Sequence, residues 1–195
     1  MKRFFLYAVA ITALCSSCET EDEVFATETN NQTNALHQAK GVQVNNYQIY
    51  QSILNSFVYN HQQTHQENLL LFEQHVNRQM LNYVPQETYK YEKINVEQLL
   101  ILTQANLDFI KQLSYTKQTK QAIYAIIDKQ FTSDMAQLIT NENERLLIET
   151  LFALHSNGND DDFWKNKKNI AFAYGSQYSF TQAVLYAGAI ELLAK

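Results

Sequence analysis

Turn-forming residues are scarce in most of this 195-residue chain, and that scarcity limits the folds it can adopt. From Asn46 onward the sequence contains one proline, Pro85, and only the glycines Gly158, Gly175 and Gly188. β-Sandwiches and barrels need many tight turns, which are usually built from these residue types. Helices joined by short polar loops do not need them. We therefore expect an all-α domain over residues 46–195.

The spacing of the apolar residues also predicts helices. Between residues 47 and 58, and again between 69 and 83, apolar residues recur three or four positions apart, as on one face of a helix. Because the connections are short, neighbouring helices should pack antiparallel in a bundle of six to seven helices. The first two helices could instead be one, and the fifth could break near Thr140. The expected helices cover residues 46–60, 65–83, 95–113, 116–131, 132–156, 160–174 and 179–194.

Several helix ends can be predicted from local sequence. Thr64 and Glu67 form a capping-box pattern, in which each side chain can bond the backbone N–H of the other residue. Asn95 and Ser179 are placed to cap two later helices. Gly175 is typical of the position just after a helix end.

The first residues have the organisation of a secretory signal peptide. Lys2 and Arg3 form a basic start, and an apolar run of 11 residues, FFLYAVAITAL, follows them. A helix needs about 20 apolar residues to cross a bilayer, so this run is too short to be a transmembrane anchor. Its length and flanks are those of a cleaved signal. We expect residues 1–17 to be removed from the mature protein.

The chain has two cysteines, Cys15 and Cys18, and both lie at the end of this signal. No disulfide can therefore form within residues 46–195, and zinc sites built on cysteine thiolates are excluded there. The sequence ALCSSC resembles the lipobox of a bacterial lipoprotein, in which small residues precede a cysteine that is lipidated. By this resemblance Cys18 carries the lipid, because serines precede it. Cys15 follows the bulky Leu14 and leaves with the signal peptide.

The acidic residues after Cys18 are similar to the tract that follows the lipidated cysteine in surface-exposed lipoproteins of Bacteroidota. This resemblance implies export to the outer face of the outer membrane, with its periplasmic face as the alternative. Residues 18–45 are polar throughout, so we expect a flexible, disordered tether, of which the acids could simply be a solvated part. The tract consists of Glu19, Glu21, Asp22 and Glu23.

Charge and motif content exclude several classes of function. The formal net charge is −5 and no basic stripe is present, so we expect no nucleic-acid partner. The domain has no cysteine nucleophile and no G-x-S-x-G elbow. Its paired acids lack an apolar setting that would raise a pKa for acid–base catalysis. We therefore expect no enzymatic activity and no cofactor.

Two clusters could hold a metal ion. His61 and His65 in HQQTH are four residues apart and would share one face of a continuous helix, as in H-E-x-x-H, although Gln62 replaces the glutamate. The Thr64 cap favours the alternative, which is a pair of polar loop histidines. The run Asp160–Asp162 could bind calcium through its oxygens or could simply stabilise a helix start.

Two further segments have a candidate role in contacts. Tyr83, Tyr89 and Tyr91 surround the only proline, and they could form a contact loop or close the end of the bundle. The C-terminal run FTQAVLYAGAIELLAK is apolar on almost all sides, which is typical of a central helix or of a membrane-seeking one. Because this run is short for a bilayer, we expect a central helix.

These observations together predict an outer-membrane lipoprotein with a non-enzymatic domain that binds a protein or a glycan at the cell surface. One alternative is a membrane-active antagonism or immunity protein that uses the apolar C-terminal helix. A second alternative is a metal-dependent or hydrolytic enzyme whose site has no familiar motif.

Overall fold

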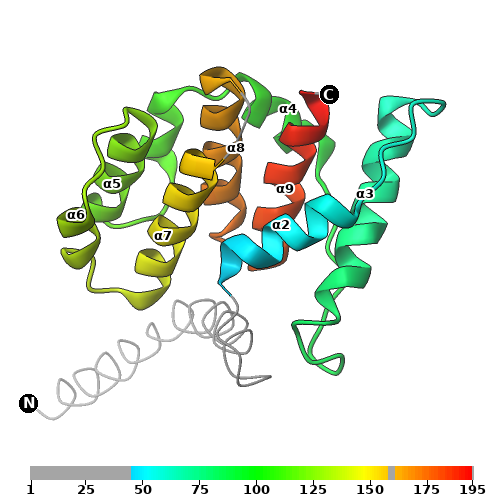
Figure 1. Cartoon of the computed structure of the whole chain (residues 1–195), viewed down its shortest axis with the longest axis horizontal. Coiled ribbons are helices and arrows are strands. Elements are labelled where there is room, and N and C mark those ends of the chain that lie inside the picture. The colour runs from blue at the N-terminus through cyan, green and yellow to red at the C-terminus, as the bar shows by residue number, and fades with distance from the viewer. Residues whose placement is uncertain (1–44, 158–160, 195) are drawn as a thin grey trace, which may run out of the picture.

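A computed structural model describes residues 45–157 and 161–194, and within these ranges every regular element is helical (Figure 1). The all-α prediction is confirmed. The signal peptide, Cys18, the acidic tract Glu19 to Glu23 and most of the 18–45 tether lie outside the described residues, as does Asp160. The elements are α2 (Asn46–Ser56), α3 (His65–Met80), α4 (Val96–Gln104), the 3₁₀ helix η1 (Leu107–Gln112), α5 (Lys117–Ile127), α6 (Ser133–Gln137), α7 (Glu142–Asn157), α8 (Asp162–Gly175) and α9 (Phe180–Leu193).

The predicted capping box separates the first two helices of the domain. The Glu67 backbone N–H donates to Thr64 Oγ1 at 3.2 Å, and the Thr64 N–H donates to Glu67 Oε2 at 2.7 Å. The two reciprocal bonds start α3 at His65, so α2 and α3 are separate helices. Asn95 and Ser179 cap α4 and α9 as expected, each accepting from the N–H three residues later.

The predicted number of six to seven helices is too low, because two predicted helices each divide into two. The segment 95–113 is wrong as one helix, since α4 ends at Gln104 and Asn106 caps the separate η1 by accepting from the Asp108 N–H at 2.9 Å. The segment 132–156 breaks around Thr140, as the open alternative allowed. Asn141 Oδ1 accepts from the Glu144 N–H at 3.1 Å there, at the start of α7.

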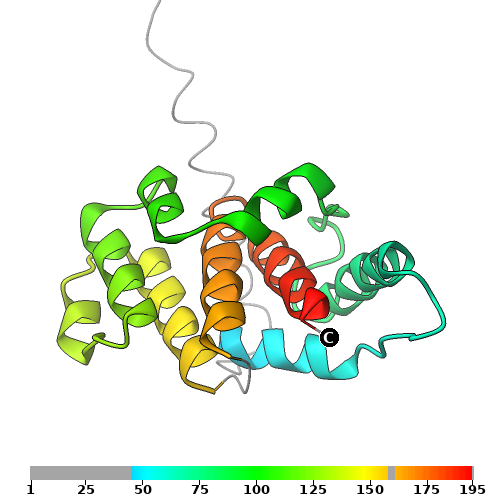
Figure 2. The same ribbon diagram turned by 90° about the horizontal axis from the view of Figure 1, so that it is seen from above.

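The centre of the domain is an antiparallel hairpin of α8 and α9 (Figures 1 and 2). Helices α5 to α7 cover one side of this pair and α3 covers the other, while α2 and α4 cross on opposite faces (Figure 2). Eleven of the fourteen residues of α9 are buried, which confirms its predicted central position. Nowhere in the described ranges is a helix both long enough and apolar enough to span a membrane.

Two glycines permit the tight packing of α9. Gly175 does not follow α8, as predicted, but is its last residue, and a Cβ there would lie 2.5 Å from the Cα and backbone N of Ala183. A Cβ on Gly188 would lie 2.3 Å from the Phe72 ring of α3. Both positions therefore need glycine because two elements approach closely, not because a turn requires it.

Candidate functional site

A pocket of about 340 Å³ lies where the first turns of α2, α7 and α9 meet the end of α8 and the segment before α5. This volume falls near the lower end of the range of about 300–1,000 Å³ that is typical of small-molecule sites. The pocket joins segments that are far apart in the sequence. Its lining residues are Asn46, Ser114, Tyr115, Asn141, Asn143, Glu144, Leu146, Leu147, Phe172, Ser176, Gln177, Ser179 and Phe180.

Glu144 is the one charged residue among the described residues of this lining. Its Oε1 accepts from the Thr116 backbone N–H at 3.2 Å. Its Oε2 accepts from the Thr116 hydroxyl at 2.6 Å and also from the Thr119 hydroxyl. The carboxylate of α7 thus holds the first turn of α5, where negative charge is favourable. Both oxygens are engaged in building the wall of the pocket.

Other lining residues are also held by hydrogen bonds. The Tyr115 hydroxyl donates to the Ala173 carbonyl at 2.7 Å. Burial raises the pKa of Tyr115, so this phenol stays protonated at neutral pH. Gln177 Oε1 accepts from the Ser114 N–H at 2.6 Å, and its Nε2 donates to the Tyr174 carbonyl at 3.2 Å. These bonds fix the end of α8 against the segment that precedes α5.

Asn46 differs from these lining residues. It is the first residue of α2 and is 8% exposed, yet its side chain has no hydrogen bond to any residue that the structure describes. It is not needed as a cap, because Asn45 Oδ1 already accepts from the Tyr47 N–H at 2.9 Å. The amide of this largely buried residue is accessible from the pocket and has no protein partner, so it is suited to bind a ligand.

The predicted tyrosines lie elsewhere, in the segment 83–95 that follows α3. The Tyr89 hydroxyl donates to Asn77 Oδ1 at 2.7 Å, and the Tyr91 hydroxyl donates to Glu73 Oε1 at 3.1 Å. Tyr83 is half-buried against the core. Tyr91 keeps half of its surface exposed, and none of the three residues lines the pocket.

Sequence reasoning missed the two α3 residues that hold this segment. Asn77 accepts from the Glu92 N–H and donates to the Glu92 carbonyl, both at 2.8 Å. Glu73 Oε2 accepts from the Ile94 N–H at 2.7 Å. The sequence did contain a signal for them, because Glu73 and Asn77 stand next to the apolar positions of α3. A polar side chain at such a place is largely buried and needs a hydrogen-bond partner.

The pH dependence of stability should reveal the burial of Glu92. Burial raises the pKa of its carboxyl group, while hydrogen bonds from Ser179 and Gln182 oppose that shift. A raised pKa in the folded state means that stability falls as pH rises from the unfolded-state pKa of about 4.3 through the folded value. Glu92→Gln keeps an acceptor for the Ser179 hydroxyl, so its melting temperature relative to wild type should increase between pH 4 and pH 7.

Thermal unfolding across this pH range checks that result. Glu87→Gln, at an exposed position of the same segment, is the matched control and should give a difference that is small at every pH. A Glu92→Gln difference that does not change with pH would show that burial does not control the ionisation of this carboxyl group.

The two histidines of HQQTH do not share a helix face. His61 lies exposed in the turn before α3, whereas His65 is the first residue of α3. Within the described residues no group of three or more histidine, cysteine or acidic side chains is arranged to hold a metal ion. Metal binding by His61 and His65 remains an untested prediction. The shared helix face on which that prediction was based is not present.

The acids that begin α8 have structural partners. Asp161 caps the helix by accepting from the Trp164 N–H at 3.0 Å. Asp162 pairs with the Lys129 ammonium at 2.8 Å, and this bond lowers the pKa of Asp162. This ion pair joins the first residue of α8 to Lys129, which lies two residues after the end of α5.

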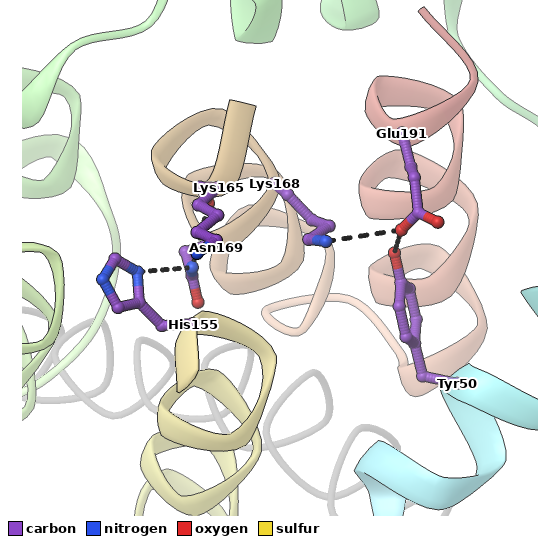
Figure 3. A network of polar contacts seen from close by, with 6 residues as sticks. All are labelled: Tyr50, His155, Lys165, Lys168, Asn169 and Glu191. Atoms are coloured by element: carbon purple, nitrogen blue, oxygen red, sulfur yellow. Dashed lines mark hydrogen bonds and ion pairs between the residues drawn. The ribbon is translucent and has the colours of Figure 1, made fainter. Parts of the chain in front are cut away.

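A second group of polar contacts lies inside the helical core (Figure 3). Lys168 Nζ lies 3.4 Å from Glu191 Oε2, and the Tyr50 hydroxyl donates to the same oxygen at 3.0 Å. These residues link α8, α9 and α2. Nearby, His155 Nδ1 lies 3.4 Å from Asn169 Nδ2. Burial and the neighbouring lysines lower the pKa of His155, so its ring is neutral at neutral pH and accepts from the asparagine amide.

Taken together, the pocket offers amides, hydroxyl groups, aromatic and aliphatic walls, and one carboxylate that is already hydrogen-bonded. Such a set can bind and orient a small polar molecule. Comparisons with protein-family models, with curated proteins and with solved structures find no match to this chain.

Proposed function

We propose that this chain is a lipid-anchored, non-enzymatic binding protein of the bacterial outer membrane, held at the cell surface by a lipid on Cys18. Its helical domain binds a component of the cell envelope in the pocket that Asn46, Glu144 and Gln177 help to form. One observation supports this function above all. The polar walls of the pocket are fixed by hydrogen bonds to the scaffold, and such preorganisation lowers the entropic cost of binding.

The state of Glu144 supports binding over catalysis. A general acid or base must exchange a proton with its substrate. Both carboxylate oxygens of Glu144 instead accept hydrogen bonds that hold the first turn of α5. The membrane-active alternative is less favoured, because it requires α9 to leave the centre of the domain.

The proposed anchor would place the pocket near the membrane. The tether meets the domain at Asn46, and this residue itself lines the pocket. The tether predicted for residues 18–45 from their polar composition would have an end-to-end distance of about 30 Å. The pocket would therefore stay within a few tens of ångströms of the lipid surface and would bind ligands located there.

Replacement of Cys18 tests the anchor. Cys18→Ala should abolish labelling with a radioactive fatty acid and release the protein from the membrane fraction, because the acceptor thiol is removed. Cys15→Ala is the matched control and should keep both the label and the membrane location. Retained lipid in Cys18→Ala, or its loss in Cys15→Ala, would contradict the assignment. Protease accessibility on intact cells separates the outer face from the periplasmic face.

A variant that fills the pocket tests the binding function. Ser114 lines the pocket, is exposed, and has no hydrogen bond from its side chain to a described residue, so Ser114→Trp should block the pocket without unfolding the domain. Envelope peptides and glycans that raise the melting temperature of the wild type should lose this effect in Ser114→Trp. Ser133→Trp, on the exposed start of α6, is the control. Equal ligand effects in both variants would place binding elsewhere.

A further inference from the structure

We infer that the pocket binds a neutral, hydroxyl-rich ligand of the saccharide class, and that the Asn46 side chain is a direct contact to it. This inference rests on the proposed function, because it names the ligand class of the same pocket. Three independent features carry it: the charge of the lining, the mixture of polar and apolar groups, and the missing partner of Asn46.

The charge of the lining disfavours an anion. Among the described residues no lysine or arginine lines the pocket, and the only charged group is the Glu144 carboxylate. A phosphate, sulfate or uronate would meet this negative charge without a cation to compensate the loss of its hydration. The positive ends of the helices that meet here are already satisfied by side chains. These caps are Asn45 on α2, Thr116 on α5, Asn141 on α7 and Ser179 on α9.

The remaining lining matches a sugar ring. Amide and hydroxyl groups can each donate and accept, as the hydroxyl groups of a saccharide do. They are joined by the apolar side chains of Leu146, Leu147, Phe172 and Phe180, against which the C–H groups of a ring can pack. A peptide with charged side chains, or a purely apolar molecule, would leave one of these two sets of groups without a partner.

Asn46 identifies where the ligand makes contact. The residue as a whole is 8% exposed and lines the pocket, and its side-chain amide, which is not among the fully buried polar groups, has no hydrogen bond to a described residue. Neither the helix start, which Asn45 caps, nor the neighbouring wall uses it. One ligand hydroxyl group could accept from its NH₂ group while another donates to its oxygen. A single asparagine amide can make both bonds, because it carries two N–H donors and a carbonyl acceptor.

Three sets of matched probes test the ligand class: glucose with glucuronic acid and glucosamine, galactose with galacturonic acid, and mannose as a stereochemical variant. Binding to the full mature lipoprotein in detergent is measured by saturation-transfer NMR and calorimetry. At least one neutral sugar should bind, and its uronic acid should bind at least tenfold more weakly. Glu144→Gln should bring the ratio of the two affinities, neutral sugar over uronic acid, toward one. Because both affinities are measured on the same protein sample, a partial loss of folded protein does not change this ratio.

Substitution of Asn46 tests the direct contact. Asn46→Ala should lower the affinity for the neutral sugar by roughly three- to tenfold, as expected for the loss of one or two neutral hydrogen bonds. Asn55→Ala, at an exposed position of the same helix, is the matched control and should leave the affinity unchanged.

Several results would overturn the inference, and they differ in what they leave standing. Tighter binding of a uronic acid than of its neutral sugar would refute the charge argument. Binding of a peptide but of no sugar, blocked by Ser114→Trp, would refute the saccharide class while the proposed binding function stands. If no ligand is found whose binding Ser114→Trp blocks, both the saccharide class and the proposed binding function are refuted. An unchanged affinity in Asn46→Ala would refute the role of this residue.

Discussion

Replacing Gly175 by alanine should lower the free energy of unfolding by about 3 kcal/mol, at the upper end of the usual range for overpacking a core. The new Cβ would lie 2.5 Å from the Cα and N of Ala183 and from the carbonyl carbon of Gln182. These are backbone atoms, so no side-chain rotation can relieve the contact. The end of α8 and the start of α9 must separate, and both belong to the central hairpin. Urea unfolding followed by circular dichroism measures the change.

The second glycine of the core supplies the control. In Gly188→Ala the nearest atom is Cζ of Phe72, a side-chain atom at 2.3 Å. Phe72→Leu makes room there, so it should partly rescue Gly188→Ala and should not rescue Gly175→Ala. Wild-type stability of Gly175→Ala, or equal rescue of both variants, would contradict the close backbone approach at Gly175.

The Gly175 variant should also affect the pocket. Ser176, Gln177 and Ser179 belong to the connection between α8 and α9, Phe180 begins α9, and all four line the pocket. A separation of the two helices would move these four residues relative to α2 and α7. The geometry of the candidate site therefore depends on the close backbone contact between α8 and α9 at Gly175.

Replacing Glu191 by alanine should lower the free energy of unfolding by about 3 kcal/mol, the lower end of the range for removing one partner of a buried ion pair. The Lys168 side chain is 4% exposed and the Glu191 side chain is 22% exposed, so water can compensate the ammonium only weakly. The substitution also removes the hydrogen bond that the Tyr50 hydroxyl donates to Glu191. Both groups would lose this carboxylate while they remain in the core.

A double variant separates loss of the charge pair from simple loss of packing. Lys168→Met with Glu191→Leu replaces both charges by apolar groups of similar size and should recover most of the lost stability. Glu149→Ala, which breaks an exposed pair with Arg145, should change stability by less than about 1 kcal/mol. A small effect of Glu191→Ala, or no recovery in the double variant, would contradict the role of the buried pair.

Local sequence determined the helical character of the domain and most of its helix starts. The capping box of Thr64 and Glu67, the cap at Asn95 and the cap at Ser179 each involve residues no more than three positions apart. Their hydrogen bonds form within one turn, so they can be predicted without knowledge of the fold. The central position of α9 could likewise be predicted, because its residues are apolar on almost all sides of the helix. Such a helix must be covered by other elements on all of these sides.

Only the tertiary structure decided the role of Gly175, the buried Lys168–Glu191 pair and the pocket. Gly175 has the sequence context of a helix terminator, but its actual constraint comes from Ala183 across the helix pair. Asn46, Ser114, Glu144 and Gln177 carry no motif and are separated by tens of residues. Hydrogen bonds within a turn depend on neighbours along the chain, whereas a pocket depends on which helix ends meet. Long-range packing makes that choice, and the packing is not encoded in any single segment.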